Sequence, residues 1–291
     1  MYYHVNGELV PESEATVSVA DRGFQYGDGA FETIRAYGGT PFEWDAHRER
    51  LQRTAETLGF GDAVPDDLRE RVDETLAEND LADAYVKVMV TRGSQPGKLT
   101  PDPEVDPTVV VIVKELPRGG TEGEAVWDGP ADVQSVKTRK IPSEALPADA
   151  KTHNYLNGIL ARLELRRAAT DEYSADEALV RDTEGRVVEG ATSNLFLVTE
   201  AGLKTPSADL DLLPGVTRSV VMELAEAEGF PVEEGKYTVA DVRGADEAFL
   251  TNSTWEIRPV GSVDGIDVGT GPMTKLLQRL YDERVETTCY E

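Results

Sequence analysis

The sequence is poor in cysteine and histidine, which removes several kinds of active site. Its one cysteine, Cys289, excludes an internal disulfide and a cysteine-based metal cluster. The three histidines, at positions 4, 47 and 153, lie in unlike contexts and show no ligand spacing such as His-Glu-x-x-His. We therefore expect no metal site. Polar chemistry must come from Lys, Arg, Glu, Tyr and hydroxyl groups, or from an organic cofactor.

Positive charge is also scarce. The chain carries 55 acidic against 29 basic residues, a formal net charge of −26, and only 9 of the basic residues are lysines. Such a field repels phosphate backbones and anionic membrane surfaces, which argues against nucleic-acid and lipid partners. Acid-rich, lysine-poor surfaces resemble those of proteins from salt-loving microbes, where salt screens the self-repulsion. The alternative is simply an acidic protein from a mesophile.

Long apolar runs are absent. The longest, at about residues 109–113, is strand-sized and far shorter than the roughly 20 residues that span a bilayer. The start of the chain has no basic segment followed by an apolar one, so we expect no secretory signal and a cytoplasmic protein. A length of 291 residues favours two domains over one.

The pattern of apolar residues and turn signals predicts a mixed α+β chain in two parts. A hairpin that turns at Asn6-Gly7 opens the chain. Further strands are expected at 29–37, 85–91, 108–113, 132–137, 177–181, 194–198 and 246–251, and helices at 45–59, 65–78, 154–169, 216–228 and 273–286. The Gly- and charge-rich stretch 116–124 is the predicted linker. It separates a smaller N-terminal domain, residues 1–115, from a larger cofactor-binding domain, residues 125–291.

Several short segments carry residue types suited to chemistry. Lys151 stands just before a helix whose apolar stripe contains Leu156, Ile159, Leu160 and Leu163, so its amine can project from a rigid base. Glu189 ends an extended segment and is followed by Gly190, which allows a tight turn. Pro214-Gly215 precedes a helix start, where free N–H groups and the helix dipole favour a phosphate. Taken singly, these features also fit a solvated lysine, a surface hairpin and a capped helix.

Taken together and in this order, the segments resemble the class IV, or fold-type IV, pyridoxal-phosphate (PLP) enzymes. That family includes branched-chain and D-amino-acid transaminases and 4-amino-4-deoxychorismate lyase. The strongest matches are K-T-H-N-Y-L-N at 151–157, E-G-x-x-S-N at 189–194, L-x-G-V-T-R at 213–218 and E-I-x-P-V at 256–260. The resemblance covers residues 6 to about 280. It implies the two-domain α+β fold of the D-amino-acid and branched-chain aminotransferases, PLP as cofactor, a small-molecule substrate and a homodimer.

The resemblance also assigns roles to individual residues. Lys151 matches the lysine that forms the Schiff base with PLP and later carries the proton. Glu189 matches the carboxylate that stabilises the protonated pyridine nitrogen. Tyr155 matches the tyrosine near the cofactor's phenolic oxygen. Arg50 matches the arginine that binds the phosphate, whereas Arg48, two positions earlier, should lie on another face of the helix.

The remaining assignments concern the phosphate and the substrate. The amides of Val216 and Thr217 should bind the phosphate at the helix start, and Ser253 and Thr254 should supply hydroxyl groups. Ser193 and Asn194 are further cofactor-binding candidates. Tyr26, Phe31 and Lys87 are the candidates on the substrate side.

The choice between reactions depends on a few positions, and they favour the lyase. K-T-H-N-Y-L-N and T-N-S at 251–253 are similar to the lyase type, and Lys87 stands where branched-chain enzymes place an arginine. Residues 94–101 lack the Arg-x-His of D-amino-acid transaminases. The favoured expectation is 4-amino-4-deoxychorismate lyase, which releases pyruvate and 4-aminobenzoate in folate biosynthesis.

Two alternatives stay open. Tyr26 and the 189–194 run suit an amino-acid transaminase that uses 2-oxoglutarate, with branched-chain or D-amino acids as donors, equally well. The fold could also serve as a non-catalytic binding module. The presence of both Lys151 and Glu189 speaks against that last reading, because a scaffold without chemistry needs neither residue.

Overall fold

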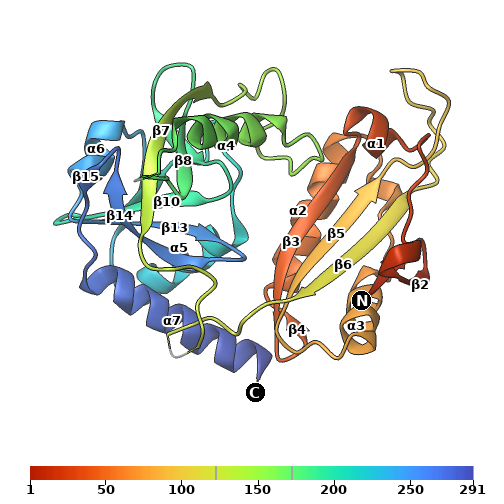
Figure 1. Ribbon diagram of the computed structural model, residues 1–291, viewed down its shortest axis with the longest axis horizontal. Helices are drawn as coiled ribbons and strands as arrows, with labels where there is room; N and C mark the ends of the chain where they lie inside the picture. Colours follow the sequence, from red (N-terminus) through yellow and green to blue (C-terminus); the bar gives the residue numbers. More distant parts are fainter. Residues whose placement is uncertain (122, 172, 291) are drawn as a thin grey trace. The chain divides into compact units, whose positions relative to one another are not determined.

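The computed structural model describes residues 1–121, 123–171 and 173–290. The chain divides into two compact units, each with its own sheet (Figure 1). Unit 1 comprises Met1–Arg118, Ala150–Asn154 and Val285–Glu291, and unit 2 comprises Gly119–Asp149 and Tyr155–Arg284. Lys151 therefore belongs to the same unit as the N-terminal residues. The predicted linker 116–124 includes residue 122, which lies outside the described residues.

Unit 1 contains a six-stranded antiparallel sheet with the order β2-β1-β6-β5-β3-β4. Its strands are β1 (Tyr2–Val5), β2 (Glu8–Pro11), β3 (Gly29–Tyr37), β4 (Thr40–Pro41), β5 (Ala84–Thr91) and β6 (Thr108–Glu115). The predicted hairpin is confirmed: Asn6 and Gly7 both have positive φ, 49° and 96°, as a two-residue turn between twisted strands requires.

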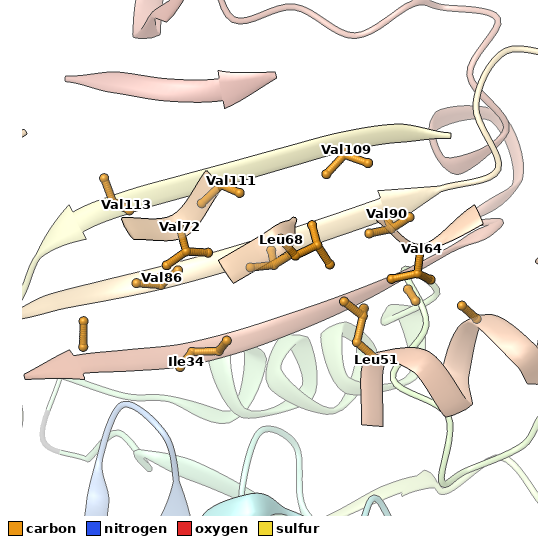
Figure 2. Packing of buried hydrophobic residues seen from close by; sticks show 14 of the residues in the cluster. Ile34, Leu51, Val64, Leu68, Val72, Val86, Val90, Val109, Val111 and Val113 are labelled. Carbon is orange, nitrogen blue, oxygen red and sulfur yellow. The ribbon is translucent and has the colours of Figure 1, made fainter. Parts of the chain in front are cut away.

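Helices α2 (Trp44–Thr57) and α3 (Leu68–Glu78) cover one face of this sheet (Figure 1). Unit 1 also has the short helices η1 (Glu12–Glu14), α1 (Arg22–Tyr26) and η2 (Gly61–Ala63). Side chains alternate along a strand, so every second residue of β3, β5 and β6 faces α2 and α3. Figure 2 shows the resulting core, formed by Ile34, Leu51, Val64, Leu68, Val72, Val86, Val90, Val109, Val111 and Val113. The opposite face of β3 and β5 does not pack against α2 and α3.

Unit 2 contains a nine-stranded mixed sheet with the order β12-β11-β10-β13-β14-β7-β8-β9, in which β15 pairs with β14. Its strands are β7 (Ala131–Arg139), β8 (Glu177–Arg181), β9 (Val187–Gly190), β10 (Asn194–Thr199), β11 (Gly202–Pro206), β12 (Val232–Gly235), β13 (Glu247–Asn252), β14 (Glu256–Val263) and β15 (Ile266–Asp267). Three neighbouring pairs are parallel and the others antiparallel. Both units are thus mixed α and β, as predicted.

The remaining helices are α4 (Leu156–Ala168), α5 (Val216–Ala227), α6 (Val239–Arg243) and α7 (Pro272–Cys289). The stripe on α4 is not the face that packs within unit 2. Leu156 and Ile159 are more than half exposed and Leu160 is 46% exposed, whereas Ala161 and Leu165, four residues apart, are buried. No helix in the described ranges combines the length and the apolar character needed to cross a bilayer.

Leu68 tests the core of unit 1. Its side chain is fully buried, so Leu68→Ala should lower the free energy of unfolding by about 2–5 kcal/mol through lost burial and the cavity left behind. Leu99 is 81% exposed, and Leu99→Ala should change stability by less than about 0.5 kcal/mol. Urea unfolding of both variants measures the difference. Equal losses would contradict the assigned core.

Candidate active site

Lys151 lies in a short extended segment that is fixed against β3 within unit 1. The N–H of Phe31 donates to the carbonyl of Lys151 at 3.0 Å, and the N–H of Lys151 donates to Thr54 Oγ1 at 3.0 Å. The next residue, Thr152, forms an isolated antiparallel bridge with Ala30. Three neighbouring contacts thus hold the backbone from which the lysine side chain projects. The sequence predicted support from the helix that follows Lys151, whereas these contacts come from β3 and α2 of unit 1.

Phe31 brings two lysines close together. Its ring centroid is 4.7 Å from Lys151 Nζ and 4.9 Å from Lys87 Nζ. Phe31 and Lys87 lie on the sheet face opposite α2 and α3, and Lys87 pairs with Thr33 in the β3–β5 register. Burial and the nearby charge of Lys151 lower the pKa of Lys87. Two of the three substrate candidates therefore accompany Lys151, whereas Tyr26, 42% exposed at the end of α1, stacks with Arg22.

Arg50 is buried and held by Glu32. Its Nε and Nη2 donate to the two oxygens of Glu32 at 2.8 and 2.7 Å, and His47 Nδ1 lies 2.7 Å from Glu32 Oε2. Burial raises the pKa of Glu32, but the charges and hydrogen bonds of Arg50 and His47 outweigh it and lower the pKa to about 2. Burial also lowers the pKa of His47, against the opposing effect of Glu32. Arg48, by contrast, donates to Gln52 at 2.9 Å, on a different face of α2.

Glu32 and His47 were not singled out from the sequence. A signal for Glu32 was available, because it occupies the face of β3 that also carries the buried Ala30 and Ile34. A carboxylate on such a face needs a cationic partner. The partners lie on α2, and their identity could not be read from strand periodicity.

Glu189 lies in β9 of unit 2, with 8% of its surface exposed. Its Oε1 accepts a hydrogen bond from Lys140 Nζ, and its Oε2 accepts one from the N–H of Leu213 at 3.0 Å. Burial alone lowers the pKa of Lys140, but Glu189, together with Tyr155 and Asp211, raises it. Lys140 was missed in the sequence. It directly follows β7, in a chain with few lysines.

The turn after Glu189 is built around a buried carboxylate, Glu177, which the sequence also did not indicate. Glu177 Oε2 accepts hydrogen bonds from the N–H and hydroxyl of Thr192, at 3.2 and 2.6 Å, and from Ser193 Oγ at 3.2 Å. Gly190 is required here, because a Cβ would lie 2.2 Å from Ser193 Oγ. Ser193 thus serves the turn itself.

The start of α5 adjoins this turn. Asn194 Nδ2 donates to the carbonyl of Leu213 at 2.9 Å, and a Cβ on Gly215 would lie 2.2 Å from Asn194 Oδ1. No side chain caps the helix, which begins at Val216, and both Val216 and Thr217 are buried. The first N–H groups of a helix have no intrahelical partner, so this start combines donors with the positive end of the dipole.

The turn between β13 and β14 lies beside Asn194, because Asn194 pairs with Thr251 in the β10–β13 register. Ser253 and Thr254 are half-buried in this turn, and Asn252 Oδ1 accepts from the N–H of Thr254 at 3.0 Å. Thr251 Oγ1 is buried and has no hydrogen-bond partner among the residues that the structure describes. Unit 2 therefore gathers the 189–194, 213–218 and 251–254 segments around an uncapped helix start and an unsatisfied hydroxyl.

These donors suit a phosphorylated pyridine. The helix start and hydroxyls of unit 2 match a phosphate, and a buried carboxylate matches a ring nitrogen that carries a proton. Unit 1 supplies a lysine on a fixed backbone and a buried arginine. No group of three or more His, Cys, Asp or Glu residues in the described parts of the chain could hold a metal ion.

Comparison with known proteins identifies the family. Residues 29–263 match the model of amino-transferase class IV, so this chain belongs to the class IV aminotransferase family, and PLP is its cofactor. A putative branched-chain-amino-acid aminotransferase from Methanocaldococcus jannaschii is 38% identical over 97% of this chain and 96% of that protein. D-alanine aminotransferase from Listeria monocytogenes is 32% identical over 99% and 97%.

Comparison with solved structures gives the same family. Branched-chain aminotransferase from Thermoproteus uzoniensis superposes with a TM-score of 0.87 at 29% identity, covering 100% of this chain and 96% of that one. A putative 4-amino-4-deoxychorismate lyase from Legionella pneumophila gives 0.82 at 27% identity, covering 94% and 97%. The predicted family and the α+β fold of the branched-chain and D-amino-acid aminotransferases are thereby confirmed.

The buried pair of Glu32 and Arg50 makes a pH-dependent prediction. Glu32→Gln leaves Arg50 without its carboxylate and should lower the free energy of unfolding by about 3–5 kcal/mol at pH 7. Because the folded pKa of Glu32 is depressed, its contribution is present above the unfolded value of 4.5 and lost as pH falls toward about 2. The difference between wild type and variant should therefore shrink over that range.

Glu49→Gln is the matched control, since Glu49 forms an exposed i,i+4 pair with Arg53 on the same helix. It should change stability by about 1 kcal/mol or less. Chemical unfolding at several pH values measures both variants. A Glu32→Gln effect as small as that of the control, or one independent of pH, would contradict the assigned pair.

Proposed function

We propose that this protein is a PLP-dependent amino-acid aminotransferase, with a branched-chain or a D-amino acid as donor and 2-oxoglutarate as acceptor. The observation that carries the proposal is the near full-length similarity to aminotransferases of these two kinds, at 38% and 32% identity. The lyase favoured by the local motifs has weaker support, from a structure at 27% identity. Similarity over the whole chain samples many more positions than Lys87 and residues 251–253 do.

Lys151 is the proposed catalytic residue. PLP, when bound, supplies a ring that accepts the electron pair left on the amino-bearing carbon of the substrate. The Lys151 amine would hold the cofactor covalently and, as a free amine, would move the proton of that carbon. The hydrogen bonds of its backbone to Phe31 and Thr54 restrict the directions that the amine can take.

Glu189 and Tyr155 are proposed to bind the ring. The ionised Glu189 accepts the hydrogen bond of the pyridine N–H, and its charge favours the protonated ring. Tyr155 precedes α4 and is one of the residues that raise the pKa of Lys140, the partner of Glu189. We assign its hydroxyl to the cofactor's phenolic oxygen.

The phosphate is proposed to bind at the start of α5. Val216 and Thr217 donate their amides, and Ser253 and Thr254 donate hydroxyl groups from the turn after β13. Ser193 and Asn194 hold this region together, through Glu177 and through the carbonyl of Leu213. Arg50 supplies the cation, and Glu32 fixes its guanidinium in one orientation.

The substrate is a small amino acid or keto acid, and we assign Phe31, Lys87 and Tyr26 to its binding. Lys87 places a cation beside Lys151, which suits a carboxylate of the substrate. The same residue supports the second candidate, the lyase, because aminodeoxychorismate also carries carboxylates. A homodimer remains part of the proposal.

The test follows the products of parallel reactions. Purified protein is incubated with L-leucine, L-valine or L-isoleucine, and with D-alanine, each with 2-oxoglutarate, and separately with aminodeoxychorismate. We expect glutamate and the matching keto acid from one of the two amino-acid groups. Each reaction is run at low and at molar salt, because the net charge of −26 is screened only in the latter.

Glu189→Gln is the control that ties activity to this site, since it should keep PLP bound while turnover falls by orders of magnitude. Release of pyruvate and 4-aminobenzoate without any keto acid from the amino acids would establish the lyase instead. Absence of every product with PLP bound would remove both candidates.

A further inference from the structure

Lys140 is the cation in contact with the carboxylate proposed to bind the ring nitrogen. The side chains of Lys140 and Glu189 are only 19% and 10% exposed, and Lys140 Nζ donates to Oε1. The N–H of Leu213 donates to the other oxygen, Oε2, at 3.0 Å. A carboxylate offers about four lone-pair positions, so these two donors leave room for a third, the N–H of a pyridine ring.

The charged surroundings of this pair are mostly anionic. Asp211, in the segment before α5, and Tyr155, before α4, both favour the protonated form of Lys140, as Glu189 does. Asp211 is itself engaged, since its Oδ1 accepts from the N–H of Ser143 at 2.8 Å. The Lys140 ammonium thus contacts one carboxylate, and the effect of Asp211 on its pKa has the same sign as that of Glu189. These neighbours keep its charge in place over the neutral pH range.

Lys140 has the wrong position to carry the cofactor itself. In PLP the carbon that bonds the lysine amine lies para to the ring nitrogen, on the opposite side of the ring. An amine that contacts the carboxylate at the ring nitrogen is therefore at the far end of the ring from that carbon. A protonated amine is also a poor nucleophile.

We propose that Lys140 is a positioning residue that stabilises the ionised form of Glu189, so that the proton shared with the pyridine nitrogen stays on the ring. In a buried site, a neutral pair of carboxylic acid and pyridine competes with the ion pair, because both charges have lost their water. A cation beside the carboxylate stabilises the anion and so decides the competition. This inference rests on the proposed role of Glu189.

The experiment locates the proton directly. PLP labelled with ¹⁵N in the ring is bound to the wild type and to Lys140→Met, Lys140→Gln and Lys140→Arg, and the ¹⁵N chemical shift is recorded near pH 7.5. We expect the pyridinium shift in the wild type and in Lys140→Arg. The two neutral variants should move toward the shift of unprotonated pyridine.

PLP affinity gives a second readout that does not depend on turnover. Without the cation, the buried carboxylate loses its charged partner, which should weaken the binding of a protonated ring. The dissociation constant of PLP should therefore be higher for the neutral variants than for the wild type. Lys204→Met is the matched control, because Lys204 pairs with Glu233 at 3.7 Å in the same unit, with Glu233 62% exposed. It should follow the wild type.

Two results would overturn the inference. One is a pyridinium shift in both neutral variants, which would reduce the Lys140–Glu189 contact to a structural ion pair. The other is a movement toward unprotonated pyridine in Lys140→Arg as large as in the neutral variants, which would mean that the positive charge is not what keeps the proton on the ring. Using two neutral substitutions covers the case in which one of them does not fold. Failure of the proposed function is distinct, because it would show as missing transamination products of the wild type, whereas this inference is read from the ¹⁵N shift of the bound cofactor.

Discussion

Cations paired with buried carboxylates organise the residues proposed to bind the cofactor, with Arg50 buried and Lys140 half-buried. Arg50 is fixed by both oxygens of Glu32, and Lys140 contacts Glu189. Desolvation makes either partner unfavourable alone, so each pair persists only as a unit with defined geometry. In the proposed site, the carboxylate of the first pair would orient a cation for the phosphate, and the cation of the second pair would orient a carboxylate for the protonated ring. The two ion pairs thus differ in which partner, the cation or the carboxylate, is proposed to contact the cofactor.

The acidity of the chain makes these local arrangements necessary. A net charge of −26 opposes a phosphate dianion, so binding depends on donors that act at short range. An uncapped helix start and a buried hydroxyl at Thr251 are of this kind. Lysine is also used sparingly: of nine in the chain, Lys87, Lys140 and Lys151 are half-buried and belong to the proposed site. Arginine forms most of the ion pairs elsewhere.

The sequence predicted the family, the main elements and the segments that unit 2 gathers around the α5 start. Those features depend on local signals, such as turn residues, periodicity and short motifs. The partners Glu32, His47, Glu177 and Lys140 were not predicted, because each pairs with residues distant along the chain. Lys140 and Glu189, for example, are 49 positions apart. No periodic pattern encodes such a contact.

Two inferences from local patterns depend on context that the pattern does not contain. The α4 stripe was a valid helical face, but periodicity does not say what covers a face, and Leu156 and Ile159 are exposed. The preference for the lyase depended on a few positions, whereas the whole-chain comparisons favour aminotransferases. In both cases a local pattern was used to decide a question that depends on its wider context.

The attachment point of PLP tests the account most directly. Borohydride reduction of the holoprotein makes the link between cofactor and lysine permanent, and proteolysis with mass spectrometry then locates the modified residue. The account predicts modification of Lys151 and of no other lysine. Modification of Lys140 or Lys87, or a reduced protein without any covalent cofactor, would contradict it.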